Sequence, residues 1–98
     1  MTDVNVEELK KDIDLSESLQ KLFNNKDFKK VFTEVYLKQY PLQLVQLLAG
    51  QAAIRDASLK DLFLTRLTAT GSLQQWFDSV IAAGENAKEV LNQIDKGE

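Results

Sequence analysis

The residue types that usually carry catalysis are largely missing from this chain. It has no cysteine and no histidine, which removes thiolate nucleophiles, imidazole bases and the usual zinc ligands together. Neighbouring carboxylates could still divide acid and base roles if their pKa values were driven apart. The candidate pairs are Glu7 with Glu8, Asp12 with Asp14, and Glu85 with Glu89. All three pairs fall on helix faces that we expect to be solvated, so the sequence predicts no enzyme, no catalytic residue and no cofactor.

One acidic segment partly matches a calcium-binding loop. Asp12, Asp14 and Ser16 mimic the first ligands of such a loop. The position that requires glycine is Glu17, and the position of the final glutamate is Phe23. The sequence therefore predicts no metal site.

Charge is distributed unevenly within the net value of −3. Residues 1–17 hold six acids against two lysines, whereas residues 21–38 hold five lysines against two acids. The lysines of 21–38 interleave with aromatic residues, as in many nucleic-acid surfaces. At helical spacing the aromatics fall on one face and the lysines on the solvated face, and overall acidity weakens attraction to phosphate, so packing is favoured over nucleic-acid binding. The candidate residues for an anionic partner are Lys26, Lys29, Lys30 and Arg66.

A long stripe of apolar and small residues organises the C-terminal part of the chain. From Leu73 to Ile94 it advances in alternating steps of four and three, which is typical of a helix packed lengthwise on another helix. Gly84 and Ala87 lie in its middle and would let a neighbouring helix approach closely. The spacing does not decide whether that neighbour belongs to the same subunit or to another. The candidate interface residues are Leu73, Trp76, Phe77, Val80, Gly84, Ala87 and Leu91.

Every apolar run of the chain has helical spacing, and none alternates with the period of two that a half-buried strand needs. We therefore expect a single all-α domain over residues 1–98, built as a small bundle of four to five helices with a long heptad-like C-terminal helix. The first helix should run from about Asp3 to Phe23. Residues 1–17 could form an acidic helical arm, because the first half of this helix has only one apolar residue per turn.

Turns are expected at Asn24-Asn25, Pro41, Gly50 and Gly71. Asn25 or Asp27 should cap the second helix, and Pro41 should end or kink it. The segment 42–49, apolar nearly all round, should be the most buried, and Gly50 should close it with a left-handed cap. Ser58, followed by Asp61, resembles a capping box for the fourth helix, and Ser72 should cap the last helix.

The chain has no apolar run near the roughly 20 residues that a membrane span needs. Its first residues lack the basic and then apolar order of a secretion signal, and the absence of cysteine fits a reducing compartment. The sequence thus predicts a cytoplasmic protein with no membrane partner.

Two runs of the sequence resemble a known group of proteins. They are DFKKVFTEVYLKQYPLQLVQLLA and TATGSLQQWFDSVIAAGENAKEVL, and the resemblance covers roughly residues 22–91. In helix pattern and in the positions of aromatics and glycines they resemble small helical proteins encoded in tailed-bacteriophage genomes, commonly near head and packaging genes. The resemblance implies a phage-encoded protein that acts by binding, in the host cytoplasm or in the virion, and it carries no catalytic motif.

Together these features predict a non-enzymatic interaction module that self-associates and acts in virion assembly or structure. The contacts between copies should use the stripe and the acidic arm, which could lie on the basic segment of a second copy. Two alternatives stay open. One is a small phage-encoded inhibitor of a host protein, and the other is a binder of an anionic ligand or nucleic acid through residues 21–38.

Overall fold

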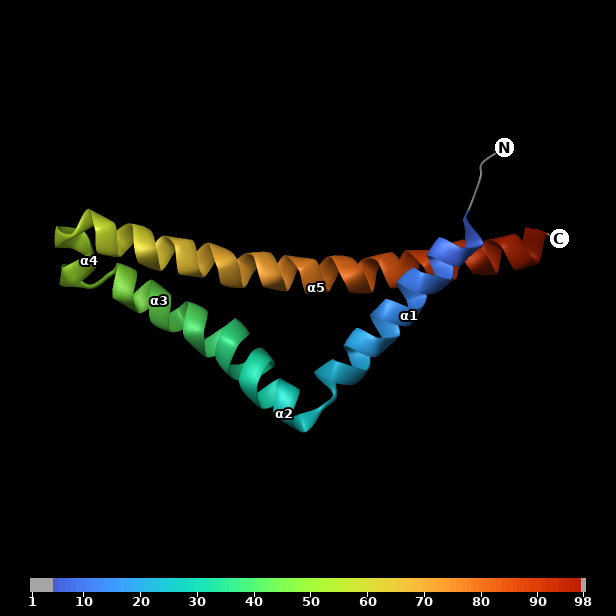
Figure 1. Ribbon diagram of the computed structural model, residues 1–98, viewed down its shortest axis with the longest axis horizontal. Helices are drawn as coiled ribbons and strands as arrows, with labels where there is room; N and C mark the ends of the chain where they lie inside the picture. Colours follow the sequence, from blue (N-terminus) through green and yellow to red (C-terminus); the bar gives the residue numbers. More distant parts are fainter. Residues whose placement is uncertain (1–4, 98) are drawn as a thin grey trace.

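The computed structural model describes residues 5–97, and every regular element in this range is a helix (Figure 1). In chain order the elements are α1 (Val6–Phe23), α2 (Lys26–Phe28), the π-helix η1 (Lys29–Gln39), α3 (Tyr40–Leu48), α4 (Gln51–Arg55) and α5 (Ala57–Gly97). Because α2, η1 and α3 follow one another without a break, the described residues form four helical segments and no strand, which confirms the all-α class and the long C-terminal helix. The predicted helix start at Asp3 and the first four residues of the acidic arm lie outside the described residues.

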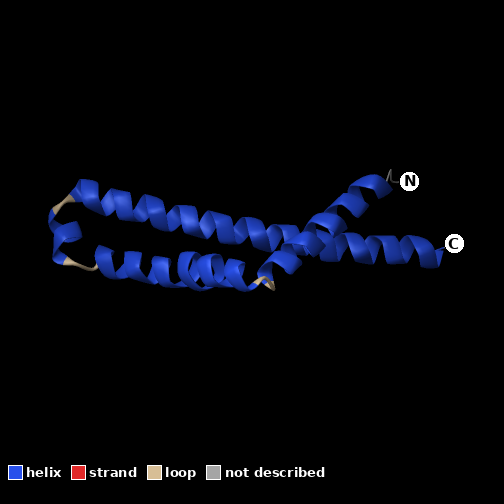
Figure 2. Cartoon of the chain, turned by 60° about the horizontal axis from the view of Figure 1, so that its bottom comes forward, coloured by secondary structure: helices blue, strands red, loops and turns tan. Residues whose placement is uncertain are grey.

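The helices form a flat, three-sided frame. Its long side is α5, and its two shorter sides are α1 and the α2–η1–α3 run, which meet at α2 (Figure 1). The frame measures 65 × 34 × 16 Å. Its shortest dimension is little more than the diameter of one helix with its side chains, about 10–12 Å. In Figure 2 α3 runs alongside α5 while α1 crosses it, so most helices have solvent on at least one side.

α5 continues through Gly71 without interruption, so the predicted helix end at Gly71 and the predicted cap at Ser72 are wrong. The stripe that begins at Leu73 also extends to the N-terminal side of the glycine, where Leu67 is partly buried and Thr70 is buried. The Thr70 hydroxyl donates to the Leu67 carbonyl oxygen at 2.7 Å, which satisfies it within the helix. A glycine inside a helix costs about 1 kcal/mol relative to alanine, and packing of the stripe on both sides outweighs that cost.

The helix caps differ in part from the predicted ones. Asp56, not Ser58, caps α5: its Oδ1 accepts a hydrogen bond from the Ser58 backbone N–H at 3.0 Å. The chain does turn at Gly50, but this residue is the extended N-cap of α4 with φ of −79°, so the predicted left-handed cap is wrong. The turn at Asn24-Asn25 is confirmed, and Asn25 Oδ1 accepts from the Phe28 backbone N–H at 3.0 Å.

Pro41 lies inside a continuous helical run, so the predicted turn at this residue is wrong. The type of helix changes here instead. η1 ends at Gln39, the Tyr40 N–H donates to the Val35 carbonyl five residues earlier, and Pro41 falls in the first turn of α3. A proline cannot donate a backbone hydrogen bond and crowds the carbonyl of the preceding turn. The π-helix directly before Pro41 lets the backbone pairing change at this point while the chain stays helical.

Burial is concentrated on the inner side of the frame. The main cluster consists of Leu19 from α1 with Phe77 and Val80 from α5. In the segment 42–49 only Leu44 is buried, whereas Leu42 is 59% exposed. The prediction that this segment is the most buried is wrong, because a helix that is apolar all round needs neighbours on all sides and the flat frame places α5 on only one.

α1 meets α5 through small residues. Ser16 of α1 is buried, and its hydroxyl accepts a hydrogen bond from Gln20 Nε2 at 3.1 Å. A Cβ at Gly84 of α5 would lie 2.5 Å from Ser16 Oγ and 3.3 Å from the Asp12 carbonyl oxygen. Ala87, about one turn further along α5, is fully buried. The glycine of the stripe therefore permits close packing inside one chain, the first of the two interpretations that the sequence left open.

The two internal glycines of α5 should respond in opposite directions to alanine. Nothing lies within 4 Å of a Cβ added at Gly71, so Gly71→Ala should raise the free energy of unfolding by about 0.5–1 kcal/mol. Gly84→Ala should lower it by about 1–3 kcal/mol, because the new carbon overlaps Ser16. Urea unfolding followed by circular dichroism measures both changes. A Gly84→Ala variant as stable as Gly71→Ala would contradict the close packing of α1 on α5.

Candidate interaction surface

Most of the predicted interface stripe is covered by other helices of the same chain. Its buried members are Phe77, Val80, Gly84 and Ala87, and its partly buried members are Leu73 and Leu91. Trp76 is the exception, with 52% of its surface exposed. A partner could reach the buried part of the stripe only by displacing α1, whereas it could contact Trp76 directly.

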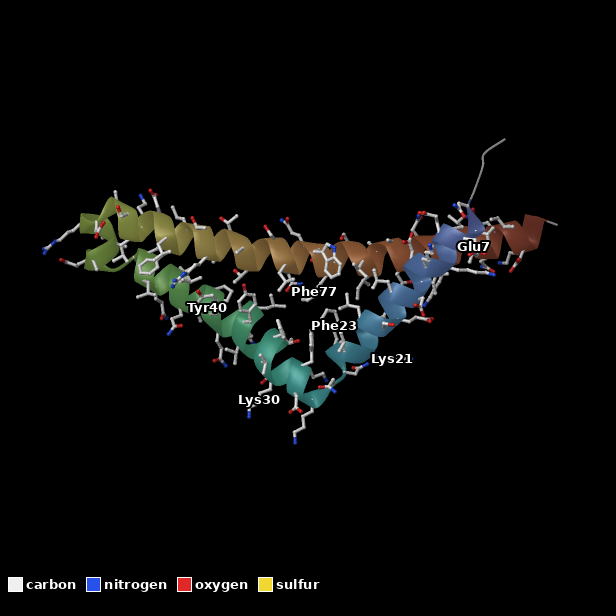
Figure 3. All side chains as sticks on the ribbon, viewed as in Figure 1. Glu7, Lys21, Phe23, Lys30, Tyr40 and Phe77 are labelled. Atoms are coloured by element: carbon white, nitrogen blue, oxygen red, sulfur yellow. The ribbon has the colours of Figure 1, made fainter. Side chains whose placement is uncertain are left out.

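Aromatic rings connect the three sides of the frame. Phe77 of α5 meets Phe23 of α1 edge to face with ring centroids 5.3 Å apart, and Phe23 lies 5.6 Å from Phe28 of α2. Figure 3 places Phe23 and Phe77 on the inner side of the frame. Aromatic pairs of this kind contribute about 0.5–1.5 kcal/mol each beyond the area that they bury. The first aromatics of the basic segment therefore take part in packing.

The aromatic row continues along η1 into α3. Phe28 stacks on Phe32 at 4.9 Å, Phe32 meets Tyr36 at 6.1 Å, and Tyr36 stacks on Tyr40 at 5.7 Å. The four residues are spaced four apart, so their rings follow one line along the helical run. Tyr36 and Tyr40 at its far end form part of the wall of a groove.

This groove on η1 and α3 has no charged residue in its lining. It is lined by Val31, Val35, Tyr36, Gln39, Tyr40, Leu42, Gln43 and Gln46. Val31, Val35 and Leu42 are 55%, 46% and 59% exposed, respectively. Contiguous exposed apolar surface of this kind marks sites of interaction with other molecules. We refer to these eight residues as the uncharged groove.

Sequence reasoning missed the uncharged groove, although the sequence contains a signal for it. From Gln39 to Ile54 the chain has no acidic or basic residue, whereas 28% of the whole chain is charged. The apolar surface continues along this segment beyond the groove, where Val45, Leu47 and Ile54 are also exposed. The solvated face of a helix usually carries charged residues, so the uncharged run is the sequence signal for this exposed apolar surface.

The structure brings three of the four candidate anion-binding residues together. Lys26, Lys29 and Lys30 line one hollow at α2, together with Asn24 and Glu34. The fourth candidate, Arg66, is exposed on α5 and is not part of this hollow. The arrangement is a cluster of lysines on an outer corner of the frame, with Glu34 in the same lining and Asp27 next to Lys26 in α2.

The acidic residues gather at another corner. Glu85, Glu89 and Asp95 of α5 line a shallow hollow that Ile13 of α1 also borders. Glu17 pairs with Lys88 at 3.7 Å, and both side chains are about half exposed. An exposed ion pair of this kind contributes at most about 1 kcal/mol, so it adds little to the apolar contact between α1 and α5.

The described part of the chain was also searched for metal-ligand sets and for membrane-spanning helices. Among residues 5–97, no three aspartate or glutamate side chains come together as a set of metal ligands. None of the helices in that range is both long enough and apolar enough to span a bilayer.

Comparisons with protein-family models, with curated proteins and with solved structures give no match.

Substitutions at the adjacent residues Trp76 and Phe77 of α5 should have different effects on stability, because one side chain is exposed and the other is buried. Phe77→Ala should lower the free energy of unfolding by about 3–5 kcal/mol, because it removes the ring at the centre of the core. Trp76→Ala should cost markedly less, because half of that side chain already faces water. Chemical denaturation of both variants tests the difference, and equal losses would contradict the placement of Phe77 in the core.

Proposed function

We propose that this chain is a non-enzymatic protein-interaction module that self-associates through exposed helix faces. The observation that carries the proposal is the uncharged groove and its continuation to Ile54, where large apolar side chains face water. Among residues 5–97 the buried apolar residues are few, namely Leu19, Leu44, Ala53, Phe77, Val80 and Ala87. Covering the groove would add apolar burial worth about 25 cal/mol per Å², which a domain of this size needs.

The shape of the exposed surface suits a helical partner. Val31, Val35 and Leu42 stand in steps of four and seven along one helical run and line the same groove. Helices that dock in grooves use anchors at such spacing. Tyr36 and Tyr40 add rigid aromatic surface, which is common at the centres of interfaces.

The setting that we propose is virion assembly or structure, as the resemblance to tailed-phage proteins implies. A phage-encoded inhibitor would use the same kind of surface on a host protein. The two roles differ in where the chain is found after infection. Detection of the chain in purified virions supports assembly, and its recovery in a stable complex with one host protein, absent from virions, supports inhibition.

A second candidate function, the binding of an anionic partner, is favoured by one observation. Lys26, Lys29 and Lys30 share a hollow at the α2 corner, and the groups that would neutralise them are few. If this corner binds nucleic acid, affinity should fall steeply with salt concentration. The double variant K29E/K30E should then abolish binding, and salt-independent or absent binding to the unmodified chain removes this candidate.

A single lysine placed in the uncharged groove should disrupt association without unfolding the chain. Leu42 is 59% exposed in the single chain, so Leu42→Lys should leave the free energy of unfolding of the monomer nearly unchanged. In a covered groove the same lysine would lose its hydration, which should shift the assembly toward the 11.1 kDa monomer. Sedimentation velocity over a dilution series measures this shift.

The matched control is Ala82→Lys, which adds the same charge to an exposed position of α5 outside the groove. It should leave the assembly unchanged. A wild-type chain that sediments as a monomer at every concentration contradicts the proposed self-association. If Leu42→Lys and Ala82→Lys dissociate the assembly equally, the contact between copies does not lie in the groove.

A further inference from the structure

We infer that the π-helix η1 is a conformational device that determines which apolar face of the α2–η1–α3 run meets α5. The inference concerns how the uncharged groove comes to face outward. It does not depend on whether copies of the chain associate. It rests on the positions of the residues that the run turns toward the core.

Two residues of the run that lie nine positions apart pack against the same part of the core. Phe28 at the end of α2 and Leu37 in η1 are both partly buried against the main core cluster. The ring of Phe28 lies 6.3 Å from the ring of Phe77 in that cluster. Among the residues of η1 only Tyr36 and Leu37 are not exposed. The run therefore presents Phe28 and Leu37 on one side.

An α-helix would not place these two residues on one side. Nine residues make about two and a half turns of an α-helix, so Phe28 and Leu37 would point in opposite directions. In η1 each turn is longer, because the backbone pairs five residues apart, as the Tyr40 N–H does with the Val35 carbonyl. With about four and a half residues in each turn, nine residues make two full turns. The π pairing thus aligns Phe28 with Leu37.

Uniform α pairing would force a choice between two faces of the run. In an α-helix that continued from Phe28, Val35 and Leu42 would turn toward α5, since they follow at about two and four turns. Leu44, which is 1% exposed against α5, would then point outward. In an α-helix aligned on Leu44, Lys30 would turn toward the core in place of Phe28. The π pairing lets both ends of the run pack inward at once.

The outward position of the uncharged groove follows from this pairing. Val35 and Leu42 line the groove and are 46% and 59% exposed. They are the residues that an α-helix continued from Phe28 would turn toward α5. A change of η1 from π to α pairing would therefore cover these side chains within the chain and uncover Leu44. Segments of π-helix are frequent at functional sites, and here the segment controls whether an apolar surface faces water.

Shortening η1 tests the inference, because the inference predicts an unusual order of stabilities. Removal of the exposed residues Thr33 and Glu34 leaves Phe28 and Leu37 seven positions apart, which is about two turns of an α-helix. The segment can then adopt α pairing with both residues inward, so the urea midpoint of unfolding should stay close to that of the undeleted chain. Removal of Glu34 alone leaves them eight positions apart, which is a whole number of turns in neither kind of helix. This variant has the same charge and should have a clearly lower midpoint.

Two results of this experiment would overturn the inference. One is a midpoint that falls with the number of residues removed, so that the double deletion is the less stable variant. The other is a single deletion that is as stable as the undeleted chain. Either result would mean that the alignment of Phe28 with Leu37 does not depend on π pairing.

Thiol labelling tests the two faces without a deletion, because the chain has no cysteine of its own. In dilute solution, where sedimentation shows the monomer, Val35→Cys should react with a maleimide several-fold faster than Leu37→Cys. Uniform α pairing from Phe28 predicts the opposite order, with position 35 covered and position 37 outward. Equal or reversed rates contradict the inference. Because the measurement uses the monomer, such rates would leave the proposed self-association standing.

Discussion

The frame depends on the contact between Ser16 of α1 and Gly84 of α5. It brings two helix backbones so close that no side chain fits at position 84, and it fixes where α1 crosses α5. Because Asn24-Asn25 turns the chain immediately after α1, this crossing also sets the position of α2 and of the run that follows it. The aromatic contacts of Phe77 with Phe23 and Phe28 then hold that corner toward α5, and Leu44 completes the closure at the other end.

The crossing also determines which surfaces are left for partners. By covering the stripe from Phe77 to Ala87, α1 removes the face that looks most suited to a second subunit. The α2–η1–α3 run has α5 on one side and nothing on the other, because the described chain forms only one layer. Apolar residues on the outer side of this run therefore stay in water unless another molecule covers them. The position of the exposed apolar surface thus follows from where α1 crosses α5.

Features that depend on residue spacing could be predicted from the sequence, whereas features that depend on the packing of neighbouring helices could not. The helical spacing, the turn at Asn24-Asn25 and the close-packing role of Gly84 were predicted correctly, because each is a local property of side-chain size or spacing. Gly71 and Pro41 are also local signals, but packing along α5 outweighs the first and a change to π-helical pairing accommodates the second. The burial of 42–49 could not be predicted, because periodicity does not reveal how many helices surround an apolar one.

The candidate surfaces also differ in how they respond to ions. The acids near the start of α1 and the end of α5 lie apart from the lysines at α2 by roughly the length of α1, about 27 Å for its 18 residues. This separation is several times the Debye length of about 8 Å at physiological ionic strength, so the two corners scarcely neutralise each other within one chain. Charged contacts between copies would weaken as salt increases. Apolar contacts do not share this dependence, so association that persists at high salt must come from exposed apolar surface, such as the uncharged groove or the surface around Trp76, rather than from the charged corners.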